Sequence, residues 1–560
     1  MLTRSFIALT LICMGAAMTA AAQDLTTEIT VDRTVVTELP DAEPLKSVFP
    51  VMPQLPAADF RLQPAIYNRA SVFSPLAGNL NAPLYTGINA PLDYRGYAFG
   101  GYFPAFNAEA ALGYRFVNTK DTQAGAALSY NGFSYKSKLQ EPETTVSSNT
   151  FRAQADASHR FDAGATVTAY VDYMYSALKS PLFAAEAQKQ NISAFRASAG
   201  VSGGKRIAYD IDLGYSHFGL GKDIVNRFGT NIAPASDDRF GIDGIVSFAI
   251  GHEGNTAFAL GLGADFLKST GFKPGEFDVT PVDETSGIIK INPALRYAGK
   301  KASIKIGAIV NFGVNSPDKV FHIAPDVTLC WTPSGAFDAY VTADGGEHFN
   351  DLRWQYEQSV FAPGATASTR SFTKLRSRIG FNAHLFNDFR IGAFAGYGYV
   401  NNLPVYALTL RGADATGSAL LPLIFDTERA KSWYFGGNIG YDFRRYASIS
   451  AEGRYYTKGD FSSADRAHMV LDASLKIFPI EKLSFEATYT LRARRHYSAP
   501  LVGCVNMHNS SLLGLTANYA ITERFSAFAS VRNLLNRRCL STPLVESRPL
   551  HGLVGVSYLF

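Results

Sequence analysis

The sequence has little charge for its length, and after its first residues it has no long hydrophobic run. Asp, Glu, Lys and Arg make up 18% of the 560 residues, and the formal net charge is +4. A soluble chain of this size usually carries more charge. Beyond residue 22 no stretch of about 18 apolar residues occurs, which excludes a membrane-spanning helix. If the chain enters a membrane, it must do so as a closed β-barrel, because only helices and closed sheets pair all their backbone groups in lipid.

Cysteine is scarce. The chain has four cysteines, and one of them, Cys13, lies in the N-terminal apolar run. The remaining number is too small for a disulfide scaffold. Cys504 and Cys539 lie in the links of neighbouring predicted strands, and both links are expected outside the cell. That environment is oxidising, so a disulfide could form there. We hypothesise a disulfide between them, with two unpaired thiols as the alternative.

Motifs that carry chemistry are also lacking. There is no phosphate-binding loop, no His-Glu-x-x-His and no Cys-x-x-Cys. Gly200–Gly204 has the spacing of a nucleophile elbow, but it sits in a tight turn between two predicted strands with no helix after it. No basic run suggests nucleic acid as a partner. The sequence therefore predicts no catalytic residue, no cofactor and no metal site, and the protein is not expected to be an enzyme.

Two N-terminal segments, residues 1–22 and 23–93, differ from the rest of the chain. Arg4, the apolar run Phe6–Met14 and three alanines before Gln23 predict a secretory signal peptide over residues 1–22. Residues 23–93 follow as an arm that holds nine prolines. Because proline removes backbone donors and interrupts strand ladders, this arm is predicted to be a periplasmic or lumenal segment rather than barrel wall.

From residue 94 to 560 the pattern alternates with period two, which is typical of strands with two different environments. In 207–215, for example, Ile, Tyr and Leu alternate with Asp and Gly. We predict 22 such segments, long enough to cross a bilayer at a tilt. Short and long connections alternate between them, as in barrels with periplasmic turns and outer loops. The alternative, a secreted β-propeller or sandwich, would have strands about half as long. The fold class is thus an all-β, antiparallel transmembrane barrel of a Gram-negative outer membrane.

The last segment, 548–560, alternates to its end. Its apolar and aromatic face is predicted to carry Val554, Val556, Tyr558 and Phe560. A final strand that ends on an aromatic residue resembles the signal by which the barrel-assembly machinery recognises outer-membrane proteins. Outer-membrane lipid and lipopolysaccharide are the other expected partners. The basic cluster Arg492, Arg494, Arg495 and His496 is interpreted as a solvated rim, or alternatively as a site for anionic ligands or lipopolysaccharide sugars.

The segment 525–538, followed by Ser547-Arg548-Pro549 and by 555–560, resembles the last two strands of TonB-dependent receptors. That family typically has Asn-Leu-Phe-Asn/Asp-Lys-Lys-Tyr, then Gly-Arg, then a final strand ending in Phe. Here Leu535, Cys539 and Ser547 depart from the pattern. The resemblance implies a barrel of 22 strands, an outer-membrane location and a role in transport.

Family members also carry an N-terminal plug of well over a hundred residues, and the arm is too short for one. We therefore expect a plugless barrel whose arm, loops or partner occupies the lumen. Within the arm, Glu28, Ile29, Thr30 and Val31 resemble a TonB box able to add a strand to a partner's sheet; a leader without function is the alternative. The predicted function is solute passage or ligand binding across the outer membrane. The alternative is a non-transport scaffold whose arm recruits a periplasmic partner for envelope assembly or export.

Overall fold

The computed structural model describes residues 95–560 except for short gaps in turns and loops. Three predictions lie outside the described residues: the signal peptide, the proline-rich arm and the TonB-box-like residues Glu28, Ile29, Thr30 and Val31. The predicted absence of a plug is therefore not tested by the structure. The gaps are 105, 139–142, 180–187, 205–206, 223, 226–230, 233, 251–254, 272–281, 316–319, 361–367, 386–387, 409–410, 414–418, 421–422, 444–445, 458–466, 500–502 and 543–544.

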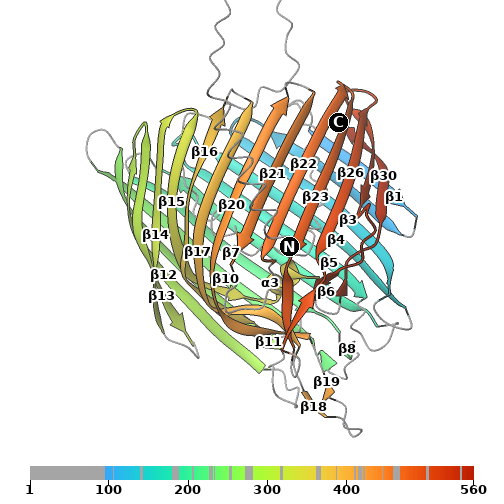
Figure 1. Cartoon of the computed structure of the whole chain (residues 1–560). Helices are drawn as coiled ribbons and strands as arrows, with labels where there is room; N and C mark the ends of the chain where they lie inside the picture. The colour runs from blue at the N-terminus through green and yellow to red at the C-terminus, as the bar shows by residue number, and fades with distance from the viewer. Residues whose placement is uncertain are drawn as a thin grey trace, which may run out of the picture. The chain divides into compact units, whose positions relative to one another are not determined.

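The described residues form a closed antiparallel barrel (Figure 1). The main sheet has 24 strands, of which β24 and β25 form a hairpin outside the wall, so the wall has 24 − 2 = 22 strands. The wall strands are β1 (Gly96–Phe103), β2 (Asn107–Asn118), β3 (Thr122–Ser137), β4 (Thr144–Arg160), β5 (Thr166–Lys179), β6 (Gln190–Gly203), β7 (Ile207–Leu220), β10 (Ala235–Ile250), β11 (Thr256–Gly271), β12 (Val282–Ala298), β13 (Ala302–Val314), β14 (Phe321–Ser334), β15 (Phe337–Asn350), β16 (Thr369–Leu385), β17 (Phe389–Leu408), β20 (Leu423–Phe443), β21 (Ala447–Tyr456), β22 (Met469–Ile480), β23 (Leu483–Ala493), β26 (Ser510–Ala520), β27 (Phe525–Arg532) and β30 (His551–Leu559).

The remaining elements belong to the connections. They are the short strands β8 (Ile224–Val225), β9 (Asn231–Ile232), β18 (Arg411–Ala413), β19 (Ala419–Leu420), β24 (Arg495–Ala499), β25 (Gly503–Met507), β28 (Leu540–Thr542) and β29 (Val545–Glu546), and one helix, α3 (Leu352–Gln358). The connections alternate in length along the chain. At one end they are tight, as at 299–301 and 481–482, and at the other they are long, as at 351–368 and 533–550. We refer to these as the inner and outer ends.

The barrel closes where its first strand pairs with its last. Tyr97 is in register with Leu559, and the pairing runs antiparallel to Tyr102 and Val554. Beyond that register, the backbone N–H groups of Arg95 and Gly96 donate to the carbonyl of Phe560 at 2.9 and 2.8 Å. Every described wall strand therefore has a hydrogen-bonded neighbour on both sides, as a sheet in hydrocarbon requires.

The predicted 22 segments are confirmed. Most predicted boundaries agree with the wall strands to within a few residues. The larger differences are at the outer end. The alternation predicts a long link over 401–429, but β17 and β20 continue into it, and β15 continues to Asn350. Strand pairing persists there beyond the apolar alternation, because the ladder is made by backbone groups and does not need a hydrophobic face.

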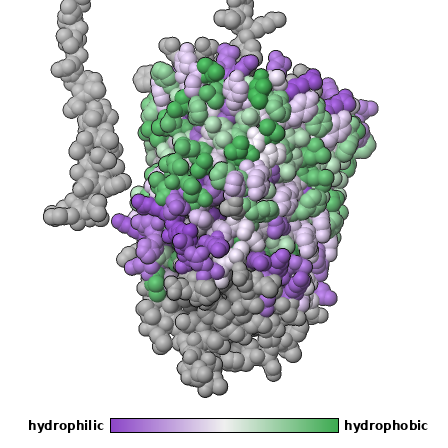
Figure 2. Space-filling model, turned by 90° about the vertical axis from the view of Figure 1, so that its right-hand side faces the viewer, coloured by the Kyte–Doolittle hydropathy of each residue, from purple (hydrophilic) through white to green (hydrophobic). Residues whose placement is uncertain are grey.

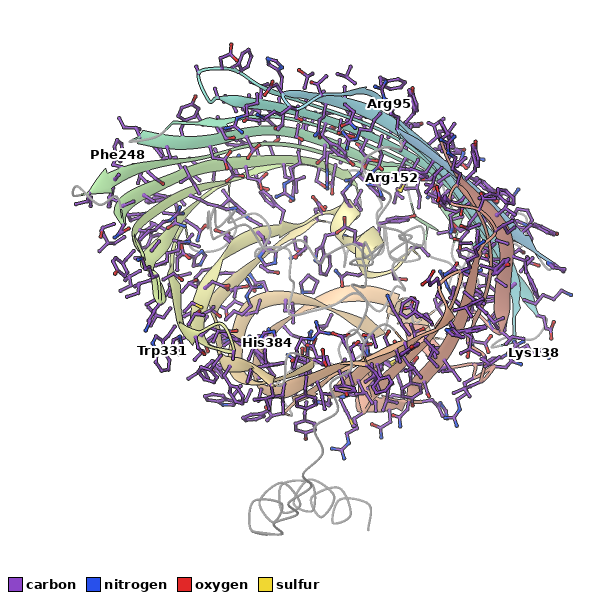
Figure 3. All side chains as sticks on the ribbon, turned by 90° about the horizontal axis from the view of Figure 1, so that it is seen from above. Arg95, Lys138, Arg152, Phe248, Trp331 and His384 are labelled. Atoms are coloured by element: carbon purple, nitrogen blue, oxygen red, sulfur yellow. The ribbon has the colours of Figure 1, made fainter. Side chains whose placement is uncertain are left out.

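The wall has two chemically different faces. Large apolar side chains are exposed on the outer face, among them Phe248 (42%) and Trp331 (55%), whereas Arg152 points into the lumen (Figure 3). Figure 2 shows apolar side chains gathered in a band along the wall, with hydrophilic side chains towards one end. As predicted, Val554, Val556, Tyr558 and Phe560 share the outer face. In the described part of the chain, no helix is long and apolar enough to cross a bilayer.

A charge on the outer face should oppose folding into lipid. Leu213, in the middle of β7, is 44% exposed on that face, and Gly214 beside it faces the lumen with open space where a Cβ would be. We expect Leu213→Arg to cost about 2–4 kcal/mol of folding free energy in vesicles, and Gly214→Arg, the matched control, less than about 1 kcal/mol. Urea titrations of vesicle-folded protein, followed by heat-modifiable gel mobility, measure both. Equal costs would contradict a lipid-facing outer surface.

Candidate functional site

The lumen contains a short helical segment, Asp351–Val360, which we call the lumenal strap. Its helix α3 lies within the ring of wall strands (Figures 1 and 3). The helix begins because the Asp351 side chain caps it, accepting a hydrogen bond from the Trp354 backbone N–H at 2.8 Å. It ends where Ser359 returns to an extended conformation. The link expected to lie outside the barrel thus folds back into it.

A single buried carboxylate holds both ends of this loop. Asp237, on the lumenal face of β10, is 3% exposed. One of its oxygens accepts hydrogen bonds from the Leu352 backbone N–H and from the Ser368 hydroxyl, each at 2.6 Å, and the other accepts one from Ser269 at 2.5 Å. Hydrogen bonds to a carboxylate are stronger than neutral ones, so Asp237 fixes where loop 351–368 leaves and rejoins the wall.

Two ion pairs add to this attachment. Arg239 bridges the capping carboxylate of Asp351, at 3.2 Å, to Asp265 on β11. On the other side of the helix, Arg353 lies 3.9 Å from Asp172, a carboxylate that is 1% exposed. Arg152 also donates to Asp172, through two nitrogens at 2.6 and 3.0 Å. Asp351 and Arg353 of the strap are therefore each matched by a wall charge of opposite sign.

The strap also buries apolar side chains against the wall. Leu352 is 2% exposed, and the Tyr356 ring lies 5.7 Å from the Phe218 ring. They belong to one cluster with wall residues Leu178, Ile192, Ala194, Leu220 and Ala235. Burial of one leucine contributes about 1.5–3 kcal/mol. The strap is thus a packed part of the lumen rather than a free loop. The Asp351 cap and the four-residue spacing of Leu352 and Tyr356 are the signals by which it could have been predicted.

Weakening the attachment of the strap at Asp237 should open the lumen. Asn at position 237 keeps the size of Asp but loses the charge and one of its acceptor oxygens, so Asp237→Asn should weaken the attachment of the strap by about 1–3 kcal/mol. Single-channel conductance in planar bilayers should rise. Asp210→Asn is the control, because Asp210 lies on the lumenal face of β7 nearer the inner turn. A conductance unchanged in both variants would show that the strap does not restrict the lumen.

A second lumenal feature is an aromatic wall with one arginine on it. Phe394, Tyr434 and Tyr456 lie side by side on β17, β20 and β21, with ring centroids 6.2 and 5.7 Å apart. The guanidinium of Arg378 lies 3.7 Å from the Phe394 centroid and 5.6 Å from that of Tyr340. Its Nε is buried and has no hydrogen-bond acceptor among the described residues. The residue as a whole is partly exposed, and none of the described carboxylates forms an ion pair with it, so its charge is suited to an anionic ligand.

The rings lie flat against the wall because two glycines make room for them. A Cβ on Gly396 would come within 2.2 Å of the Tyr434 ring, and one on Gly436 within 2.4 Å of the Phe394 ring. Both glycines lie on the lumenal side of their strands, next to the ring in question. The shape of the aromatic wall therefore depends on the absence of two side chains.

This dependence can be measured directly. Gly396→Ala should displace Tyr434 and destabilise the barrel by about 1–3 kcal/mol, the usual cost of overpacking. Gly398→Ala is the matched control, because the same strand there has nothing within 4 Å of a new Cβ. Unfolding midpoints in urea compare the two. If the variants were equally stable, the contact of Gly396 with Tyr434 would not constrain the wall.

The predicted rim cluster 492–496 does not act as one group. Arg492 pairs with Asp472 at 2.9 Å, while the Arg494 guanidinium lies 5.9 Å from the Tyr455 ring. Arg495 is 1% exposed and donates to the Leu540 carbonyl at 2.6 Å. Three arginines within four residues thus have three different environments, which sequence spacing alone does not reveal.

The segment that resembles the family motif forms a compact outer turn. The Asn533 side chain, at a left-handed φ of 52°, donates to the carbonyls of Arg537 and Arg548 at 3.0 and 2.8 Å. It thereby ties the Asn-Leu-Leu-Asn turn to the Ser-Arg-Pro segment. Arg548 lies over the Phe133 ring at 4.2 Å. Burial, with repulsion from Arg532, lowers the pKa of Arg548 to about 10.

The remaining sequence predictions have mixed outcomes. Cys539 is buried with its Sγ 3.5 Å from the Ser547 hydroxyl, but the side chain of Cys504 lies outside the described residues, so their disulfide stays a prediction. Ser202 of the elbow-like segment is a paired residue of β6 opposite Thr166. Among residues 95–560, as far as they are described, no group of three His, Cys, Asp or Glu side chains could hold a metal ion. Recognition of the last strand by the assembly machinery also stays a prediction.

Comparison with known proteins adds to this geometry. No family model and no curated protein matches the sequence. Solved structures do match. A siderophore receptor, PirA, from Acinetobacter baumannii has a TM-score of 0.60 at 9% identity over 83% of this chain and 80% of its own. FpvA of Pseudomonas aeruginosa, bound to a heterologous pyoverdine, has a TM-score of 0.62 at 11% identity over 83% of this chain and 72% of its own. A ferric enterobactin receptor of the same organism has a TM-score of 0.58 at 10% identity over 83% of this chain and 80% of its own.

The protein is thus an integral outer-membrane barrel with the fold of TonB-dependent receptors. The closed ring of 22 strands, its apolar outer face and its polar lumen place it there on physical grounds.

Proposed function

We propose that this protein binds a bulky anionic chelate of the siderophore class in its lumen and passes it across the outer membrane. The observation that carries the proposal is Arg378, whose buried Nε lacks a partner among the described residues while its guanidinium lies on aromatic rings. The similar structures include a ferric enterobactin receptor and FpvA bound to an iron–pyoverdine complex, and this chain has the same kind of barrel.

The chemistry of such a ligand matches the wall. A guanidinium supplies charge-assisted hydrogen bonds to an anion, and the neighbouring rings of Phe394, Tyr434 and Tyr456 offer apolar area to flat, partly aromatic groups. A few polar groups on a mostly apolar wall is the usual composition of a site for a small molecule. The strap lies in the same lumen, and in this proposal it moves when a bulky ligand passes.

Energised uptake would need a periplasmic partner. The TonB-box-like residues Glu28, Ile29, Thr30 and Val31 are suited to strand addition at a partner's sheet edge. We propose them as the contact with TonB or a similar protein. A plug-free lumen, with the strap as its main obstruction, belongs to the same proposal. No observation on the described residues favours the scaffold alternative.

The test is binding and uptake by the full chain. Purified protein is titrated with ferric enterobactin and ferripyoverdine as probes, by quenching of intrinsic fluorescence. We expect Arg378→Ala to weaken binding about 10- to 100-fold, the equivalent of about 1.5–3 kcal/mol for a hydrogen bond to a charged group. Arg492→Ala is the control, since Arg492 is already paired with Asp472. Arg378→Lys should recover only part of the loss, because lysine lacks the planar donor fork.

The same variants separate binding from energised passage. Deletion of residues 28–31 should leave binding unchanged and abolish uptake of the labelled chelate by cells. If both probes failed to bind the unaltered protein, the siderophore class would be wrong. If deletion of 28–31 left uptake unchanged, the proposed contact with TonB would be wrong, whatever the ligand.

A further inference from the structure

Three cations gather on the lipid-facing surface at the outer end of β16, β17 and β20. They are Lys374, Arg429 and Lys431, and they surround Tyr399; we call these four residues the outer cation patch. The Lys374 ammonium lies 3.1 Å from the Tyr399 hydroxyl and 4.6 Å from its ring centroid. The Lys431 ammonium lies 4.9 Å from the same centroid. Lys374 and Lys431 therefore share one aromatic partner, and Arg429 lies two residues from Lys431 on the same strand.

Strand register and a bulge assemble it. Tyr399 is in register with Lys431 across β17 and β20, so both point to the same face. Arg429 and Lys431 are two residues apart and both exposed, as is Trp433 two residues further on. On the other side, Thr373 and Leu375 are in register with Val400 and Tyr399, which leaves Lys374 as the bulged residue. Bulges redirect side chains, and this one brings Lys374 to Tyr399.

The patch lies where a membrane surface is expected. One step towards the inner end, the rings of Tyr397 and Trp433 lie against each other on the outer face, with centroids 4.9 Å apart and planes tilted by 50°, and Trp433 is 55% exposed. Aromatic side chains of this kind mark the boundary between hydrocarbon and headgroups. The cations just beyond them are therefore at the level of the lipid phosphates of the outer leaflet.

No acidic side chain compensates the patch. In the part of the chain that the structure describes, none of its three cations forms an ion pair with a carboxylate. Lys268 provides the contrast, because it is exposed on the outer face near the outer end of β11 but stands directly opposite Asp238 of β10. Elsewhere at this level, on β14, the exposed residues are apolar: Phe321 (51%) and Ile323 (58%). The positive charge is thus local.

We propose that the outer cation patch binds the phosphate groups of lipid A, the phosphorylated glycolipid of the outer leaflet. Two ammonium groups, a guanidinium and a phenol supply the donors that a phosphate monoester accepts. A glycolipid is favoured over a phospholipid because three clustered charges match a headgroup with more than one phosphate. The site faces lipid and shares no residue with the aromatic wall, so it is independent of the proposed transport.

The experiment uses the full chain, purified in detergent and stripped of lipid. Bisphosphorylated lipid A, dephosphorylated lipid A and phosphatidylglycerol are the probes, and native mass spectrometry counts bound lipid. One variant combines Lys374→Gln, Arg429→Gln and Lys431→Gln; Lys268→Gln is the matched control. Heat-modifiable mobility checks that each variant is folded. We expect the triple variant to bind bisphosphorylated lipid A roughly 100-fold more weakly, from the usual contribution of three surface cations, and the control to bind as the unaltered protein does.

Each other result would overturn the proposal. Equal affinity of the triple variant and the unaltered protein would show that the patch does not hold the lipid. An equal loss in Lys268→Gln would show that net charge, and not this cluster, controls binding. If the unaltered protein bound dephosphorylated lipid A or phosphatidylglycerol as tightly as bisphosphorylated lipid A, the assignment to glycolipid phosphates would be wrong.

Discussion

Complete pairing of backbone groups in the wall is the constraint on which the rest of this structure depends. In hydrocarbon an unpaired N–H or C=O has no water to bind, so the sheet must close on itself. The seam between Tyr97–Tyr102 and Val554–Leu559 meets this requirement, and the Phe560 carbonyl extends it by accepting from Arg95 and Gly96. Once the ring is closed, every second side chain must face either lipid or the lumen.

Closure creates a lumen, and the polar side chains that face it need partners for their charges and hydrogen bonds. The wall provides them through ion pairs such as Lys305 with Asp326, at 2.5 Å and largely buried. The strap does it with a mixture of charge and apolar packing. Asp237 holds the ends of loop 351–368, whereas Leu352 and Tyr356 hold its helix. Polar contacts of this kind can be exchanged for water or ligand at modest cost, while apolar packing resists displacement.

The two faces of this part of the wall bind different ligands in our proposals. On the lumenal side, Arg378 and three rings form a wall whose shape depends on glycines in the neighbouring strands. On the lipid side, Lys374 leaves the alternation through a bulge and joins Lys431 at Tyr399. Both sites include residues of strands β16, β17 and β20. A small change of register there would alter the two together, because a shift of one residue exchanges the faces.

The sequence by itself determined the strand count, the faces of the strands and the absence of a membrane helix, because period-two alternation is a local property. Val554 to Phe560 could be assigned to the outer face on that basis, and Lys305 to the lumen. Only the tertiary structure decided the site. Asp237 and Leu352 meet across 115 residues of sequence, and a seven-residue helix is too short to leave a clear periodic signal. Arg378, Phe394 and Tyr434 become neighbours through the register of three strands, which depends on backbone pairing between distant segments and cannot be read from the alternation within any one of them.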